Sequence, residues 1–195
     1  MSTLPSLLLT LIVAPAVLLG VYAIVIYNRL VALRNACANA RAGIDVNLKR
    51  RHQLIPSLVA AVKGYTEHER ETMTAVTASR TTAAAELGKP SSPTAEAALD
   101  TSMQQLTLRV EAYPDLKADA SFINLMKNLT EAEEQISASR RAFNAQVMRM
   151  NNLVQQFPSL FVAQFAGFTT LLPFSAEAAV QQAPEIALSG GNNAG

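Results

Sequence analysis

The residues that could bind a metal or act as a nucleophile are few and scattered. The chain has two histidines, His52 and His68, and one cysteine, Cys37. Glu67, His68 and Glu69 have the residue types of a metal site, but adjacent helical residues point in different directions and no second histidine follows one turn later. Cys37 lies on an apolar stripe without a histidine near it in the sequence, which favours a small core residue. We interpret both features as structural.

The motifs that hold cofactors are also missing from the sequence. It has no glycine-rich phosphate loop, no CxxC pair and no nucleophile elbow. We therefore expect no cofactor and no enzymatic activity. The basic cluster Lys49–Arg51 is short and lacks interleaved aromatic residues, so we do not expect a nucleic-acid partner.

Charge is distributed unevenly along the chain. Residues 1–28 carry no charge, residues 29–64 carry a net charge of +6, and residues 65–195 carry a net charge of −5. The composition, 50% hydrophobic and 16% charged, excludes collagen-like, disulfide-rich and intrinsically disordered classes. The total of +1 thus hides a strong gradient, which is not typical of a plain soluble domain.

The charge-free start predicts a membrane anchor over residues 1–28. Leu7–Ile26 is a run of 20 uncharged residues, and a helix of that length spans about 30 Å, the thickness of a hydrocarbon core. A cleaved signal peptide is disfavoured because no basic residue precedes the run, which is also longer than a signal core. A buried core helix is disfavoured because the run is apolar on every face.

The flanking charges predict an orientation in the bacterial inner membrane. Six Lys or Arg residues follow the span within about 25 residues and none precede it, so the positive-inside rule places the body in the cytoplasm. The short N-terminus is then outside. Arg29 and Arg34 are candidate lipid-headgroup contacts, because the attraction to anionic lipid fades within a Debye length.

Beyond the anchor, apolar residues recur every three or four positions, and strand alternation is absent. We predict an all-α antiparallel bundle of three to four helices over residues 29–174. A stem that continues the anchor is expected to reach about Ala85, with a kink at Pro56. Further helices are expected at 95–112 and 122–156, the latter N-capped by Ser121.

Two features of the bundle have more than one interpretation. Four ionisable residues on or beside the apolar stripes are candidates for setting helix register through buried ion pairs, or else flank a solvated face: Asp45, Arg51, Glu133 and Arg140. Residues 157–174 are uncharged and form either a fourth core helix or a surface for self-assembly or membrane contact. Their large apolar members include Phe157, Leu160, Phe161, Phe165, Phe168, Leu171 and Phe174. Residues 175–195 are predicted to be a partly disordered tail.

Several sequence blocks together resemble the LemA family. They are Tyr27–Val31, Leu33–Asn35, Ile44–Glu69, Glu111–Ala118 and a helical pattern from Phe122 to Pro158. The resemblance covers about residues 7–175. The sequence departs from the family pattern at the small residues Ala42 and Gly43, and in the unusually apolar stretch after Phe157.

The resemblance implies a single-pass membrane protein with a long helical cytoplasmic bundle, and no catalytic residues are established for the family. Some relatives are associated with membrane organisation, and others occur beside genes for peptidase- or phosphatase-like membrane proteins. We therefore expect a non-enzymatic membrane scaffold that self-associates into a homo-oligomer or organises partners. The alternative is an accessory or sensor subunit of a membrane-bound enzyme complex. The expected partners are membrane lipid, further copies of the chain and a membrane protein.

Overall fold

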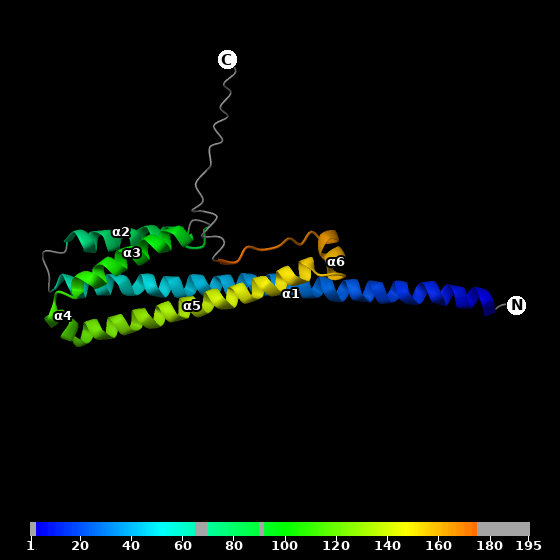
Figure 1. Cartoon of the computed structure of the whole chain (residues 1–195), viewed down its shortest axis with the longest axis horizontal. Helices are drawn as coiled ribbons and strands as arrows, with labels where there is room; N and C mark the ends of the chain where they lie inside the picture. The colour runs from blue at the N-terminus through cyan, green and yellow to red at the C-terminus, as the bar shows by residue number, and fades with distance from the viewer. Residues whose placement is uncertain (1–2, 65–69, 90–91, 175–195) are drawn as a thin grey trace, which may run out of the picture. The chain divides into compact units, whose positions relative to one another are not determined.

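The computed structural model describes residues 3–64, 70–89 and 92–174. Within these ranges the chain forms six helices and no strand, which confirms the predicted all-α class (Figure 1). The helices are α1 (Thr3–Lys63), α2 (Arg70–Glu86), α3 (Ser92–Val110), α4 (Pro114–Ala118), α5 (Ala120–Gln155) and α6 (Ser159–Phe165). The chain divides into two compact units, one built from residues up to Arg51 with Lys127–Pro173, and one built on His52–Met126.

In the first unit, α1 pairs with α5 in antiparallel orientation. The Asn47 amide donates a hydrogen bond to the Ser139 hydroxyl at 2.8 Å. The Arg41 guanidinium lies 5.7 Å from the centre of the Phe143 ring. Positions that are later on α1 therefore meet positions that are earlier on α5.

The buried residues of the seam between these two helices are three, four or seven positions apart. On α1 its buried residues are Ile26, Leu30, Cys37, Ile44 and Leu48, and on α5 they are Leu129, Ala132, Ile136, Phe143, Val147, Met150 and Val154. This spacing is that of a coiled coil, in which each seam residue inserts between residues of the facing helix. Burial of the aliphatic and aromatic side chains stabilises the pair by about 1.5–3 kcal/mol for each fully buried one.

The second unit packs the end of α1 against α2 and α3. The Arg80 side chain on α2 donates to the backbone carbonyl of His52 at 3.1 Å. The hydroxyls of Ser79 and Ser102 join α2 to α3 at 2.9 Å, and the two helices lie side by side (Figure 1). The apolar core of this unit comprises Ile55, Leu58, Val62, Met73, Val76, Ala83, Leu99, Leu106, Val110, Leu116 and Phe122.

The predicted stem to Ala85 is wrong. α1 ends at Lys63, and α2 starts anew at Arg70 and runs back along α1. Gly64 follows the last residue of α1, and glycine is a poor helix former because it loses the most backbone freedom. Pro56 lies inside α1 and does not end it. The apolar stripe continues on both sides of the reversal, so periodicity alone does not reveal that the chain turns.

The predicted N-cap of the long helix α5 is also wrong by two positions. The Asp119 carboxylate accepts hydrogen bonds from the backbone N–H groups of Ser121 and Phe122, at 2.8 and 2.9 Å. These are the second and third residues of α5, so Asp119 is the capping residue. A carboxylate there also interacts favourably with the positive end of the helix dipole.

We expect the Asp119→Ala variant to lose about 1 kcal/mol of unfolding free energy, because two N–H groups at the start of α5 lose their acceptor. Ser121→Ala is the matched control. Its exposed side chain lies at the same helix end, and we expect no change. Chemical denaturation followed by circular dichroism measures both variants. Equal losses for the two would contradict the assignment of the cap.

Candidate functional site

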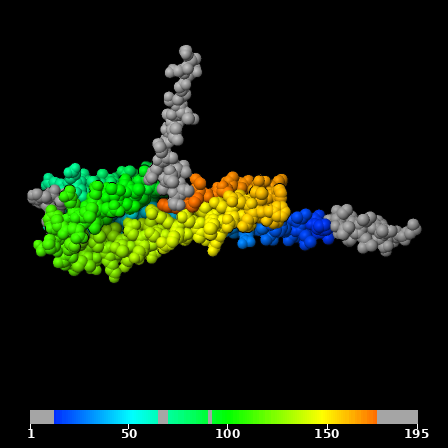
Figure 2. All heavy atoms as spheres, viewed as in Figure 1, coloured from blue at the N-terminus to red at the C-terminus, as the bar shows by residue number. Residues whose placement is uncertain are grey.

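The N-terminal part of α1 is not covered by other protein. Every side chain from Val13 to Val21 is exposed, including Leu18 at 70% and Leu19 at 68%. Consecutive exposed residues over more than two turns include every face of the helix. Among the described residues, α1 is the helix that is long and apolar enough to cross a membrane. In Figure 2 this stretch projects beyond the other described residues of its unit.

Burial on α1 begins where the apolar run ends. Ile26, the last residue of the predicted span, is 7% exposed, and Leu30 is fully buried. From Ile26 onward α1 therefore has one face against protein. The boundary predicted from composition coincides with the boundary in packing, although the side chains before Val13 lie outside those described.

Helix α6 lies beside this boundary and has an unusual distribution of side chains. Its buried residues are the small Ser159 and Ala163, whereas Phe161 and Phe165 are 63% and 98% exposed. Phe157, just before the helix, is 80% exposed and makes an edge-to-face contact with Phe161 at 6.0 Å. A surface helix in water normally buries its large apolar side chains. We call Phe157, Phe161 and Phe165 the phenylalanine face.

The α6 segment contacts α1 at the end of the apolar run. An open apolar groove is lined by Ala23, Ile24 and Tyr27 on α1, and by Phe161, Val162, Phe165 and Ala166 on the α6 side. Tyr27 also meets the ring of Phe168 edge to face, with the ring centres 6.0 Å apart. The phenylalanine face is therefore continuous with the exposed surface of α1.

Local backbone features fix the position of α6. Gly167 has a φ of +72°, which glycine adopts without steric cost. The N–H groups of Gly167 and Phe168 donate to the carbonyls of Gln164 and Ala163, which is the Schellman arrangement that ends a helix. Further on, the Asn151 side-chain amide makes two hydrogen bonds of 2.8 Å with the backbone of Leu171. The chain after α6 is thereby tied to α5.

Residues 157–174 consequently do not form a fourth core helix. α6 has seven residues and leaves its phenylalanines exposed. Leu160, Phe168 and Leu171 are half-buried in the first unit, and the half-buried Phe174 belongs to the second. The other interpretation, a surface for self-assembly or membrane contact, stays a prediction.

The two arginines that follow the span are both exposed. Arg29 lies on the turn after Ile26, and Arg34 lies just over one turn further along α1. The Arg34 guanidinium is 5.5 Å from the centre of the Phe168 ring, so the aromatic segment and a positive charge adjoin. Contact of either arginine with a lipid headgroup stays a prediction.

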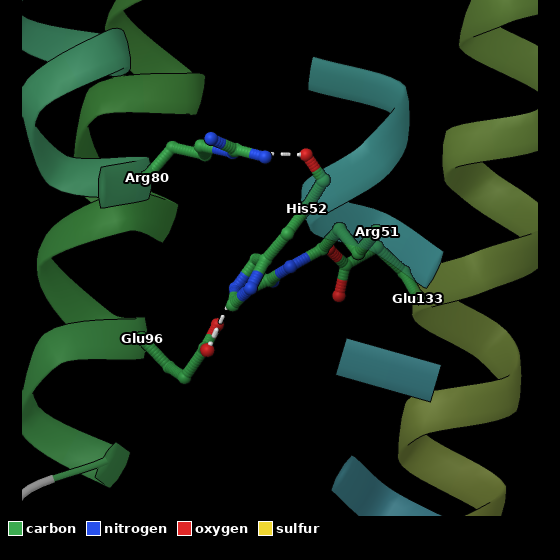
Figure 3. Close-up of polar contacts among 5 residues, drawn as sticks. All are labelled: Arg51, His52, Arg80, Glu96 and Glu133. Carbon is green, nitrogen blue, oxygen red and sulfur yellow. Dashed lines mark hydrogen bonds and ion pairs between the residues drawn. The ribbon is translucent and has the colours of Figure 1, made fainter. Parts of the chain in front are cut away.

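Two of the four register candidates form an ion pair. Arg51 Nη1 lies 2.7 Å from Glu133 Oε1, and the Arg51 side chain is 2% exposed while Glu133 is 50% exposed. Figure 3 shows the two side chains meeting between α1 and α5. Arg140 is half-buried on α5, and Asp45 is half-buried on α1. Burial raises the pKa of the Asp45 carboxyl, and the nearby Arg41 partly opposes this shift.

A second buried polar pair escaped the sequence analysis. His52 Nε2 lies 2.9 Å from Glu96 Oε1 inside the second unit, and the two side chains are 3% and 1% exposed (Figure 3). The two atoms are within ion-pair distance, but they are not aligned as a directed hydrogen bond. Glu96 lies one turn before Leu99 on the buried stripe of α3, and that spacing is the signal that would have found it.

No group of three or more potential metal ligands occurs among residues 13–64, 70–89 and 92–174. The Glu67-His68-Glu69 cluster lies outside the described residues, as does the predicted tail at 175–195. Cys37 is a buried free thiol whose pKa is raised by burial. A structural interpretation of Cys37 is therefore retained.

Comparison with known proteins agrees with the resemblance of the sequence blocks to the LemA family. The model of the LemA family matches residues 40–188. The chain belongs to the LemA family. A curated relative, Protein LemA of Metamycoplasma hominis, is 27% identical over 138 residues, which is 70% of this chain and 63% of that relative.

The LemA match begins at residue 40, after the apolar run and after Arg29 and Arg34. It includes the seam from Ile44 onward, the Arg51–Glu133 pair and the whole of α6. The family match therefore covers most of the helical body, whereas the prediction of a membrane anchor rests on the chain's own apolar segment.

We expect Glu133→Gln to lower the unfolding free energy by about 1–2 kcal/mol, because the buried Arg51 loses a charged hydrogen-bond partner. The exposed half of Glu133 limits the effect through solvent screening. Glu134→Gln is the matched control, since Glu134 is the neighbouring exposed carboxylate. Urea titration of both variants measures the difference. An equal effect in the two variants would mean that the Arg51 contact contributes nothing.

Proposed function

We propose that this LemA-family chain is a non-enzymatic scaffold, anchored in the bacterial inner membrane by residues 7–26, that self-associates or organises partners there. The observation that supports the anchor best is the uncovered part of α1. One continuous helix carries apolar side chains that no described protein covers, and then becomes half of the α1–α5 pair. Such a helix needs two different surroundings along its length.

A bilayer provides the first of these surroundings. Apolar surface left in water costs about 25 cal/mol per Å², and soluble monomers rarely expose contiguous apolar patches larger than a few hundred Å². Lipid tails remove that cost. The helix satisfies its own backbone hydrogen bonds, which the hydrocarbon core requires.

The buried ionisable groups support a structural role for the body. Arg51 pairs with Glu133 in the first unit, and His52 pairs with Glu96 in the second. Each pair joins two helices, and at least one of its two side chains is buried. Pairs of this kind specify helix register, whereas a catalytic group must also reach a substrate.

The charge gradient supports both the orientation and the self-association. The +6 segment at residues 29–64 follows the span directly, as expected for a cytoplasmic body. The net charge of −5 on residues 65–195 is complementary to the positive charge of residues 29–64. Chains packed side by side with a stagger would bring opposite charges together.

We expect Leu18→Arg combined with Leu19→Arg to release the protein from the membrane, because each arginine costs about 2.5–3.5 kcal/mol at the centre of a span. Both side chains are exposed, so the helical body is expected to fold normally. Alkaline carbonate extraction measures the membrane-bound fraction. Val46→Arg is the control, since Val46 is 67% exposed on the same helix beyond the span. Full retention of the double variant would contradict the anchor.

We expect the detergent-extracted protein to form a particle of several copies that dissociates in high salt. Raising the salt from about 0.1 M to about 1 M shortens the Debye length from about 10 Å to about 3 Å, which weakens attraction between exposed charges. Light scattering after size-exclusion chromatography measures the mass. A single chain that co-purifies with an unrelated membrane protein would favour the accessory or sensor subunit.

A further inference from the structure

We infer that the phenylalanine face of α6 inserts into the interface of the bilayer that α1 crosses, so that α6 is a second membrane-contact element. The occupant of this face is the lipid bilayer, and the inference rests on the proposed anchor. Three observations carry it: the position of α6 along α1, the chemistry of its exposed side, and the basic residues beside it.

The position of α6 matches the edge of the predicted span. The groove between α6 and α1 is lined on α1 by Ala23, Ile24 and Tyr27, which are the last turn of the apolar run and the residue after it. A bilayer crossed by residues 7–26 has its boundary at this level. The phenylalanine face therefore lies where hydrocarbon gives way to headgroups.

The chemistry of the exposed side fits that depth. Phe157, Phe161 and Phe165 are largely exposed, while the small Ser159 and Ala163 are buried. No charged residue occurs between Arg149 and Glu177, so no ionised side chain within this stretch has to be dehydrated. Helices that lie in a membrane interface present an apolar side rich in aromatic and leucine residues to the acyl chains.

The surrounding residues complete a membrane-interface pattern. Tyr27 lies beside the groove, and amphipathic aromatic rings favour the interface. Arg29 and Arg34 are exposed on the following turns of α1, on the headgroup side of that level. The Schellman hydrogen bonds at Gly167 fix the end of α6, and the Asn151–Leu171 hydrogen bonds tie the following chain to α5. The exposed phenylalanines therefore belong to an ordered surface continuous with the span.

The chain has no tryptophan, so single tryptophans can report the surroundings of chosen positions in the full-length protein. We would prepare Phe165→Trp and Phe161→Trp as probes. Val46→Trp is the water-exposed control, since Val46 lies about 30 Å beyond Ile26 along α1. Leu18→Trp is the control within the span. Circular dichroism confirms that each variant keeps its helical signal, and the second probe replaces the first if one fails to fold.

The variants are reconstituted into phosphatidylcholine vesicles with or without brominated acyl chains, and flotation selects the vesicle-bound protein. We expect brominated lipid to quench Phe165→Trp and Phe161→Trp about twofold, because an interfacial helix buries its apolar side about 5–10 Å deep. We expect Leu18→Trp to be quenched as well. Val46→Trp should respond to aqueous iodide and not to brominated lipid.

Two outcomes would overturn the inference while leaving the anchor intact, since Leu18→Trp would still be quenched by brominated lipid. In the first, iodide quenches the α6 probes as strongly as it quenches Val46→Trp, which means that the face lies in water. In the second, neither quencher reaches the α6 probes and the particle holds several copies, which means that a second chain covers the face. Loss of quenching at Leu18→Trp would instead overturn the anchor and the inference together.

Discussion

The structure depends on one constraint, which is that a single helix has different surroundings at its two ends. From Val13 through Val21, α1 exposes apolar side chains on all faces, and from Ile26 it buries one face against protein. The hydrophobic effect drives both halves, but it acts through lipid tails in the proposed span and through the facing helix in the seam. In the proposed arrangement, α5 ends at Gln155 and α6 begins at Ser159 near the level where lipid cover would stop and protein cover would be needed.

Polar contacts within the seam add specificity to a repeat that is otherwise uniform. Coiled-coil packing with small and aliphatic residues permits neighbouring registers at modest cost, and a buried charge without its partner is expensive. Arg51 finds Glu133, and Asn47 finds Ser139, only when α1 and α5 are aligned as observed. The hydrogen bonds of the Asn151 amide to the Leu171 backbone likewise fix the alignment of the chain after α6 with α5. These contacts contribute to alignment more than to net stability.

The success of prediction from sequence varied with how local the determining interactions are. The helix predicted at 122–156 is observed at Ala120–Gln155, because its apolar residues repeat over many turns. The prediction of a stem that reaches Ala85 was wrong because a chain reversal leaves the periodic pattern unchanged on either side. The prediction of the N-cap of α5 was wrong because Ser121 and Asp119 are both good capping residues, and only the backbone conformation selects between them. Glu96 was missed because its partner His52 lies far away in the sequence.

By itself, the sequence determined the helical class, the apolar N-terminal segment and the charge gradient, because each depends on composition or on the short period of one helix. Only the tertiary structure decided that Phe157, Phe161 and Phe165 are exposed rather than part of the core. A single helix with apolar residues on several sides does not specify which side is buried. That choice depends on which neighbour offers room, and α6 buries the small Ser159 and Ala163 where a phenylalanine ring would need more space.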